Sequence, residues 1–106
     1  MRTPLAGPAI QGKSPKGEAE FRSIVSRQRS SLSVEAENVN LSAATVLTVT
    51  LDHAGTPTTL GTITLNALGE GELELNSQDG ALVPVVAKGD VVKVLNGADV
   101  ILMGVF

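Results

Sequence analysis

Apolar and polar residues alternate along much of the chain from Gly17 onward. In residues 30–37, for example, Leu32, Val34 and Ala36 alternate with serines and glutamates. Successive side chains of a strand point to opposite faces, so this period of two predicts half-buried strands, and no segment shows a convincing helical period. The pattern predicts about eight strands, over residues 17–25, 30–37, 45–52, 58–65, 71–76, 81–86, 90–95 and 98–106.

The connecting segments carry turn residues. Asn96-Gly97 lies between two apolar runs and predicts a tight hairpin, while Pro84 cannot donate to a sheet ladder and predicts an edge or irregular strand. Short strands at intervals of roughly 8 to 12 residues are typical of an all-β sandwich or barrel. We therefore predict a compact antiparallel β-sandwich, of immunoglobulin-like or Greek-key type.

The last predicted hairpin departs from the alternation, because its strands are almost continuously apolar between Val91 and Val105. Strands of this kind are typically buried on both faces. The pattern indicates that the hairpin is covered on both sides or packs against another chain.

Residues 1–16 differ from the rest, since they are rich in proline, glycine and basic residues. We predict an extended N-terminal arm over residues 1–16 and a β-sandwich body over residues 17–106. An exposed sheet edge can bind such a segment through backbone hydrogen bonds and alternate apolar side chains. The arm residues suited to this contact are Leu5, Ala9 and Ile10. The arm can bind its own body or a neighbouring copy, and the sequence leaves both open.

Charge is distributed unevenly along the chain. Residues 1–29 carry six basic and two acidic residues, a net charge of +4, whereas residues 30–106 carry two basic and nine acidic residues, a net charge of −7. This asymmetry draws the arm toward the body. Glu70, Glu72 and Glu74 form an acidic row that is a candidate acceptor for a basic partner. The alternative is that the row is the solvated face of a half-buried strand and discourages edge association.

The composition offers little catalytic or cofactor chemistry. The chain is 42% hydrophobic but only 2% aromatic, and it has no cysteine, which excludes disulfides and thiolate metal sites. The aromatic shortage disfavours nucleic-acid binding, and no apolar run is long enough for a membrane span. His53 has no second histidine nearby and is expected to be a solvated turn residue. We predict no enzyme activity, no metal and no cofactor.

Asn40-Leu41-Ser42 is an N-glycosylation sequon in a predicted loop, which makes Asn40 a candidate glycosylation site.

Several segments carry a resemblance to a known group of proteins: EFRS, RSSLSVEAENVNL, GTITLN, GELELNSQDG and VPVVAKGDVVKV. Together, over residues 18–106, they resemble a small β-module of predicted secreted proteins from environmental bacteria. With its N-terminal arm, the chain is similar in design to bacterial surface fibre subunits that assemble by donor-strand exchange. The resemblance implies an extracellular or cell-surface location.

Two functional hypotheses follow. The first is a structural subunit of an extracellular bacterial filament, which polymerises head to tail with its arm bound on the neighbouring subunit. The alternative is a monomeric extracellular binding or adhesion module from a larger secreted protein, with carbohydrate as a candidate ligand. The expected partners are copies of the chain itself in the first case and glycans in the second, and the oligomeric state separates the two.

Overall fold

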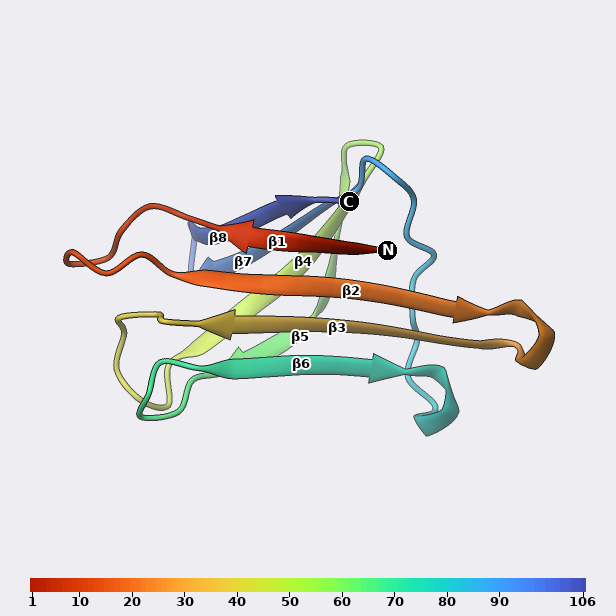
Figure 1. The fold of residues 1–106 in the computed structure, drawn as a ribbon, viewed down its shortest axis with the longest axis horizontal. Coiled ribbons are helices and arrows are strands. Elements are labelled where there is room, and N and C mark those ends of the chain that lie inside the picture. Colours follow the sequence, from red (N-terminus) through yellow and green to blue (C-terminus); the bar gives the residue numbers. More distant parts are fainter.

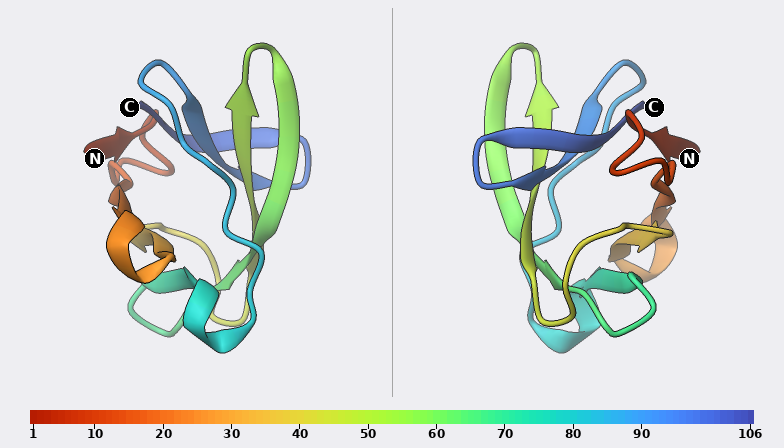
Figure 2. Two further views of the ribbon diagram at one scale, coloured as in Figure 1. Left: turned by 90° about the vertical axis from the view of Figure 1, so that its right-hand side faces the viewer. Right: turned by 90° about the vertical axis from the view of Figure 1, so that its left-hand side faces the viewer.

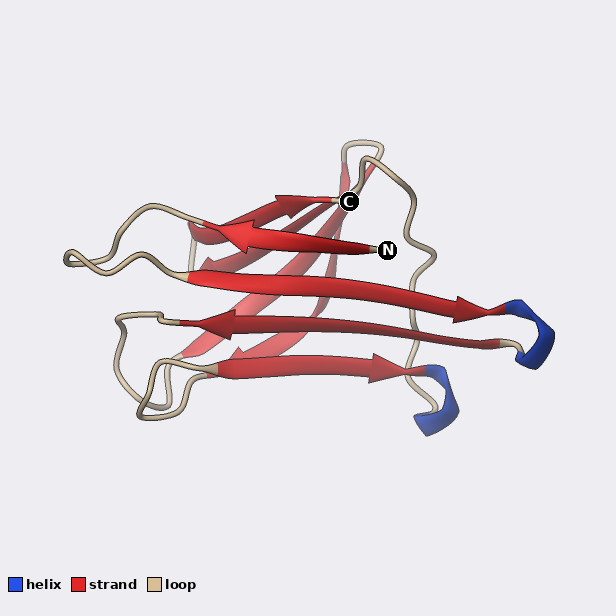
Figure 3. Ribbon diagram, in the orientation of Figure 1, coloured by secondary structure: helices blue, strands red, loops and turns tan.

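The computed structural model describes all residues, 1–106, as eight antiparallel strands and two single-turn 3₁₀ helices (Figures 1 and 3). The elements are β1 (Arg2–Ala6), β2 (Lys16–Ile24), η1 (Val25–Arg27), β3 (Arg29–Glu37), β4 (Val46–His53), β5 (Thr56–Thr64), β6 (Gly71–Asn76), η2 (Ser77–Asp79), β7 (Val91–Asn96) and β8 (Asp99–Val105). All strands belong to one sheet, in the order β5-β4-β7-β8-β1-β2-β3-β6. The prediction of an all-β antiparallel fold is confirmed.

The alternation of the sequence fixes which side chains form the core. On β4, Leu47, Val49 and Leu51 are buried, while the threonines between them face outward. Burying aliphatic side chains in this way is the main source of stability for such a sheet. The core consists of Leu5, Ala19, Leu32, Val34, Ala36, Val39, Leu47, Val49, Leu51, Ile63, Leu65, Val86, Val92, Val94, Ile101 and Leu102.

The sheet curls until its two edge strands, β5 and β6, face each other. Figure 2 shows this curl from both ends, with β2, β3 and β6 on one side and the β4–β5 hairpin on the other. The edges meet through side chains, since a Cβ at Gly61 would lie 3.0 Å from Leu73 Cδ1 and a Cβ at Gly71 would collide with Ile63. Glycine therefore lets the edges approach closely, and the strand pairing forms one curled sheet of eight strands.

The prediction of a strand over residues 81–86 is wrong. This segment crosses from η2 to β7 as a loop (Figure 3). Leu82 and Val85 are 93% and 84% exposed, while Val86 enters the core. Pro84 interrupts the run because it cannot donate a ladder hydrogen bond.

The structure does not confirm a separate N-terminal arm. The first residues form β1, an inner strand between β2 and β8, and the boundary predicted at residue 17 would divide β1 from the strand with which it pairs. The physical reason is the alternation of Thr3 and Leu5, both of which are buried in the sheet interior.

The β7–β8 hairpin predicted at Asn96-Gly97 is confirmed, although its two connecting residues are Gly97 and Ala98. No helix of the structure is long and apolar enough to cross a membrane.

Candidate functional site

The best-defined candidate site of the molecule is the position between β2 and β8 that β1 occupies in the sheet. We call this position the β1 slot. β1 lies between β2 and β8 (Figure 1), and its residues alternate between exposed and buried positions. Leu5 is 2% exposed and Thr3 is 5% exposed, so both fill the interior. This insertion of alternate side chains is how an added strand completes a sheet.

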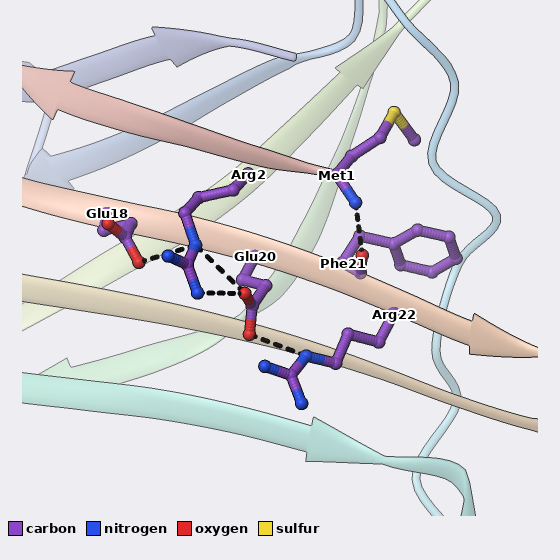
Figure 4. A network of polar contacts seen from close by, with 6 residues as sticks. All are labelled: Met1, Arg2, Glu18, Glu20, Phe21 and Arg22. Carbon is purple, nitrogen blue, oxygen red and sulfur yellow. Dashed lines mark hydrogen bonds and ion pairs between the residues drawn. The ribbon is translucent and has the colours of Figure 1, made fainter.

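On one side, β1 forms a complete antiparallel ladder with β2. Five residue pairs are in register from Arg2–Glu20 to Ala6–Lys16. The ladder extends by one further pair. The Met1 nitrogen donates to the Phe21 carbonyl at 2.8 Å (Figure 4), and the Phe21 amide donates to the Met1 carbonyl at 2.8 Å.

Charged side chains reinforce this ladder on the outer surface (Figure 4). Arg2 Nη2 lies 2.5 Å from Glu20 Oε2, Arg2 Nε lies 3.2 Å from Glu18 Oε1, and Arg22 Nε lies 2.9 Å from Glu20 Oε1. The hydrogen bond from Arg2 lowers the pKa of Glu20, and the same bond raises the pKa of Arg2. Because the Arg2 and Arg22 side chains are largely exposed, salt weakens their attraction to the carboxylates.

On the other side, β1 is held loosely by β8. Only Ala6 and Met103 form a ladder pair. A proline at position 4 removes one backbone donor from β1. The Thr3 hydroxyl adds a hydrogen bond by donating to the Val105 carbonyl at 2.9 Å.

The loop of residues 7–15, which joins β1 to β2, is fastened to the body by two asparagines. Ile10 and Lys13 exchange backbone hydrogen bonds in a tight turn. The Asn38 Nδ2 donates to the Ser14 carbonyl at 2.8 Å, and the Asn40 Nδ2 donates to the Ile10 carbonyl at 3.2 Å. We call these two side-chain contacts the loop clasp.

The three predicted arm residues occupy different positions. Leu5 is in the core, Ile10 is half-buried and packs against the core, and Ala9 is exposed. The structure therefore brings Leu5 and Ile10 onto the body of their own chain. Asn40, the sequon residue, is half-buried and belongs to the loop clasp.

The predicted acidic row lies away from β1. Glu72 and Glu74 are exposed on the edge strand β6, and Glu70 precedes it, so β2 and β3 separate the row from β1. The basic side chain of β1, Arg2, contacts Glu18 and Glu20 instead.

Carboxylates also face each other across the strands. Glu18 is paired with Glu35 across β2 and β3, and Glu35 is paired with Glu72 across β3 and β6. Partial burial, followed by the charges of Glu35 and Glu74, raises the pKa of Glu72. Like charges directly opposite each other destabilise a sheet, so this row has an energetic cost. No group of three or more histidine, cysteine or acidic side chains is arranged to hold a metal ion.

His53 has a partner that the sequence did not reveal. Its Nδ1 lies 2.7 Å from Asp90 Oδ1, while Asp90 Oδ2 accepts a hydrogen bond from the Ala87 amide at 2.9 Å. The Ala87 hydrogen bond, together with His53, lowers the pKa of the buried Asp90 carboxyl. The pair fastens the turn before β7 to the end of β4, which is a structural role.

Sequence reasoning missed Thr3, Asn38 and Asp90. Thr3 and Leu5 follow the alternation of a half-buried strand, which was a possible signal for β1, but Pro4 between them obscured the pattern. Asn38 and Asp90 bond to residues distant in sequence, so no local pattern marked them.

No family model, curated protein or solved structure matches this chain.

Proposed function

We propose that the protein is a structural subunit of an extracellular bacterial filament, in which β1 of each copy completes the sheet of the next. The observation that carries this proposal is the form of the β1 slot, which takes Thr3 and Leu5 inward between β2 and β8. The extracellular location rests on the sequence resemblance alone.

Exchange of β1 between copies needs no new contacts. Every copy has the same slot, so the ladder with β2 and the burial of Leu5 can form equally with the β1 of a neighbour. Exchange of an identical element is a low-cost route to association, because the balance then depends on the connecting loop and on concentration.

The loop is long enough for such an exchange. Residues 7–15 separate β1 from β2. A segment of this length spans at most about 30 Å when extended, and the two shorter dimensions of the molecule are 27 and 20 Å. An opened loop therefore reaches the slot of an adjacent copy.

Head-to-tail exchange leads naturally to a filament. If each copy gives β1 to the next and receives β1 from the previous one, the contact is heterologous, and it continues indefinitely unless the rotation closes a ring. The attraction of Arg2 for Glu18 and Glu20 supports docking of the incoming strand.

A covalent lock tests the proposal. Because hydrogen-bonded and non-hydrogen-bonded pairs alternate along a ladder and Met1 is hydrogen-bonded to Phe21, Arg2 and Glu20 form a non-hydrogen-bonded pair with close side chains. Arg2→Cys together with Glu20→Cys, oxidised in dilute solution, fastens β1 to its own chain. The variant needs no other change, because the chain has no cysteine.

We expect the natural sequence to form filaments at high concentration in negative-stain images and the oxidised lock to form none. Reduction of the disulfide restores filament growth. The control is Arg2→Ser together with Glu20→Ser, which removes the same charges without a lock and should still assemble. Filaments from the oxidised lock would contradict the proposal. A natural chain that stays monomeric would also contradict it and favour the monomeric binding module.

A further inference from the structure

A small hollow with a basic lining lies on the outer surface of the sheet, at the end of β2 and β3 beside η1 and η2. Its charged residues are Arg22 on β2 and Arg29 on β3, and no carboxylate lines it. The other lining residues are Ile24, Ser30, Ser31, Asn76 and Gln78. The hollow has a volume of about 200 Å³, below the roughly 300–1,000 Å³ of pockets for drug-sized ligands, so it suits a small group. We call it the arginine hollow.

Strand pairing places the two arginines of the hollow next to each other. Arg22 is opposite Ser31 across β2 and β3, and Ser31 is opposite Asn76 across β3 and β6. Arg29 lies two residues before Ser31, so it shares the outer face of β3 and is a diagonal neighbour of Arg22. Diagonal neighbours have Cα atoms about 7–8 Å apart. The two guanidinium groups can therefore act on one small ligand.

The polar side chains of the hollow offer hydrogen-bond donors. The Asn76 Oδ1 already accepts from the Gln78 amide at 3.0 Å, which leaves its Nδ2 to donate. When the Gln78 side-chain oxygen is turned toward Arg29, it accepts from the guanidinium at 3.0 to 3.1 Å, and its Nε2 remains a donor. The Ser31 hydroxyl can donate as well. A lining of donors and positive charge is complementary to an anion.

Neither arginine has a carboxylate to itself. Arg29 takes part in none of the ion pairs of the chain, although acidic residues outnumber basic ones. Arg22 Nε lies 2.9 Å from Glu20, but Glu20 also contacts Arg2 (Figure 4). The nearest glutamate of β6, Glu74, lies two residues before Asn76 and outside the hollow. Neighbouring positive charges repel each other, and an anion bound between them removes that repulsion.

We propose that the arginine hollow binds a doubly charged tetrahedral oxyanion, either a free inorganic ion or the phosphate group of a phosphate ester. Planar guanidinium groups donate paired hydrogen bonds that fit the oxygens of such ions, and two of them match a double charge. Ile24, which is 48% exposed, borders the hollow and can contact the organic part of an ester. The site does not involve β1, so it does not depend on β1 exchange.

NMR titration of the natural chain at pH 8 tests the proposal with sodium sulfate, sodium phosphate and glucose 6-phosphate, each against sodium chloride at matched ionic strength. We expect the three dianions, but not chloride, to give saturable shifts of the Arg29 Nε–H, Ser31 amide and Asn76 side-chain amide signals. Glucose 6-phosphate separates the two sources of the group. Binding at least as tight as that of inorganic phosphate assigns the hollow to an ester, and much weaker binding assigns it to the free ion.

Matched arginine variants show whether the hollow itself holds the ion. Arg29→Gln removes one charge-assisted donor group and should raise the dissociation constant of sulfate roughly tenfold. Arg29→Lys keeps the charge without the planar fork and should restore part of the affinity. The control is Arg27→Gln, which removes the same charge from η1, where Arg27 is exposed and outside the hollow. It should leave the dissociation constant nearly unchanged.

Both arginines of this comparison, Arg27 and Arg29, are exposed, and the backbone amide spectrum of each variant checks that its fold is intact. Shifts with chloride equal to those with the dianions would overturn the proposal. Equal weakening of sulfate binding by Arg27→Gln and Arg29→Gln would overturn it too, because general attraction to a basic end of the molecule would then explain the binding.

Discussion

At the scale of single residues, Leu5 connects the N-terminal segment to the core. It is 2% exposed and belongs to the same apolar cluster as the residues of the other strands. Sequence reasoning selected Leu5 as a contact of the arm, and the structure places it in a sheet. What the sequence could not show is which slot it fills, because the neighbours of Leu5 come from distant parts of the chain.

Truncation of Leu5 should destabilise the protein strongly. Leu5→Ala removes buried methyl groups and leaves a cavity, so we expect a loss of roughly 2–5 kcal/mol in the free energy of unfolding. Urea denaturation measures it. Ala9→Ser is the control from the same segment, and since Ala9 is exposed it should change stability by less than about 0.5 kcal/mol. Equal effects from both changes would show that β1 is not part of the folded core.

Ionisation of Glu72 should lower the stability of the folded protein, whereas ionisation of a carboxylate in a favourable ion pair raises it. Its pKa is raised in the folded state by partial burial and by Glu35 and Glu74. The folded state then binds the proton more tightly than the unfolded state, so stability falls as pH rises through this pKa. Glu72→Gln should therefore stabilise the protein at neutral pH, by roughly 0.2–1 kcal/mol, and the gain should vanish in acid.

Thermal unfolding at several pH values tests this expectation. The control is Glu37→Gln, because Glu37 lies opposite Lys16 rather than another carboxylate and its removal should give no gain. A stabilisation by Glu72→Gln that persists unchanged in acid would rule out charge repulsion as the cause.

At the scale of elements, alternation predicts the strands that have one solvent-exposed face, and the Asn96-Gly97 turn predicts the apolar β7–β8 hairpin, but residues 81–86 and β1 were not predicted correctly. The strand β3 and its inward residues follow directly from residues 30–37. The apolar run of residues 81–86 resembles a buried strand but crosses the molecule as a loop, since Pro84 prevents ladder pairing. Conversely, β1 escaped prediction because it is short and contains Pro4.

The loop clasp should control how easily β1 leaves its slot. Asn38→Ala combined with Asn40→Ala removes two hydrogen bonds to the loop of residues 7–15, each contributing about 1 kcal/mol. We expect the Thr3 and Leu5 amides to exchange hydrogen faster in this variant, as hydrogen–deuterium exchange can measure. Under the proposed function, filaments should also form at lower concentration.

Asn66→Ala provides a matched control for the clasp. Asn66 accepts hydrogen bonds from the Leu68 and Glu70 amides, so its loss loosens a different loop. It should leave hydrogen exchange in β1 unchanged. Equal acceleration of β1 exchange by Asn66→Ala would show that general destabilisation, rather than the clasp, governs β1.

At the scale of the whole molecule, the uneven distribution of charge along the chain gives a surface on which charge is also unevenly distributed. The basic Arg2 contacts Glu18 and Glu20 across the β1–β2 ladder, while the surface of β2, β3 and β6 is mainly acidic and the exposed side chains of β8 include Val100, Met103 and Val105. The sequence predicted the apolar terminal hairpin, and the inward side chains of this hairpin, such as Val92, Val94 and Leu102, belong to the core. β1 can fill the slot of its own chain or the slot of a neighbouring chain, and the local contacts are the same in both arrangements. No local pattern of residues therefore distinguishes the two.

The most direct measurement of β1 exchange uses two single-cysteine chains, one with Arg2→Cys and one with Glu20→Cys. The two positions lie side by side only across the β1–β2 ladder. If β1 of one copy occupies the slot of another, a concentrated mixture of the two chains, once oxidised, should give a mixed disulfide between them, detected by mass. Its yield should rise with concentration and well exceed that of a mixture of Arg2→Cys with Leu68→Cys, whose positions share no ladder. A mixed-disulfide yield no greater than that of the control pair would contradict β1 exchange.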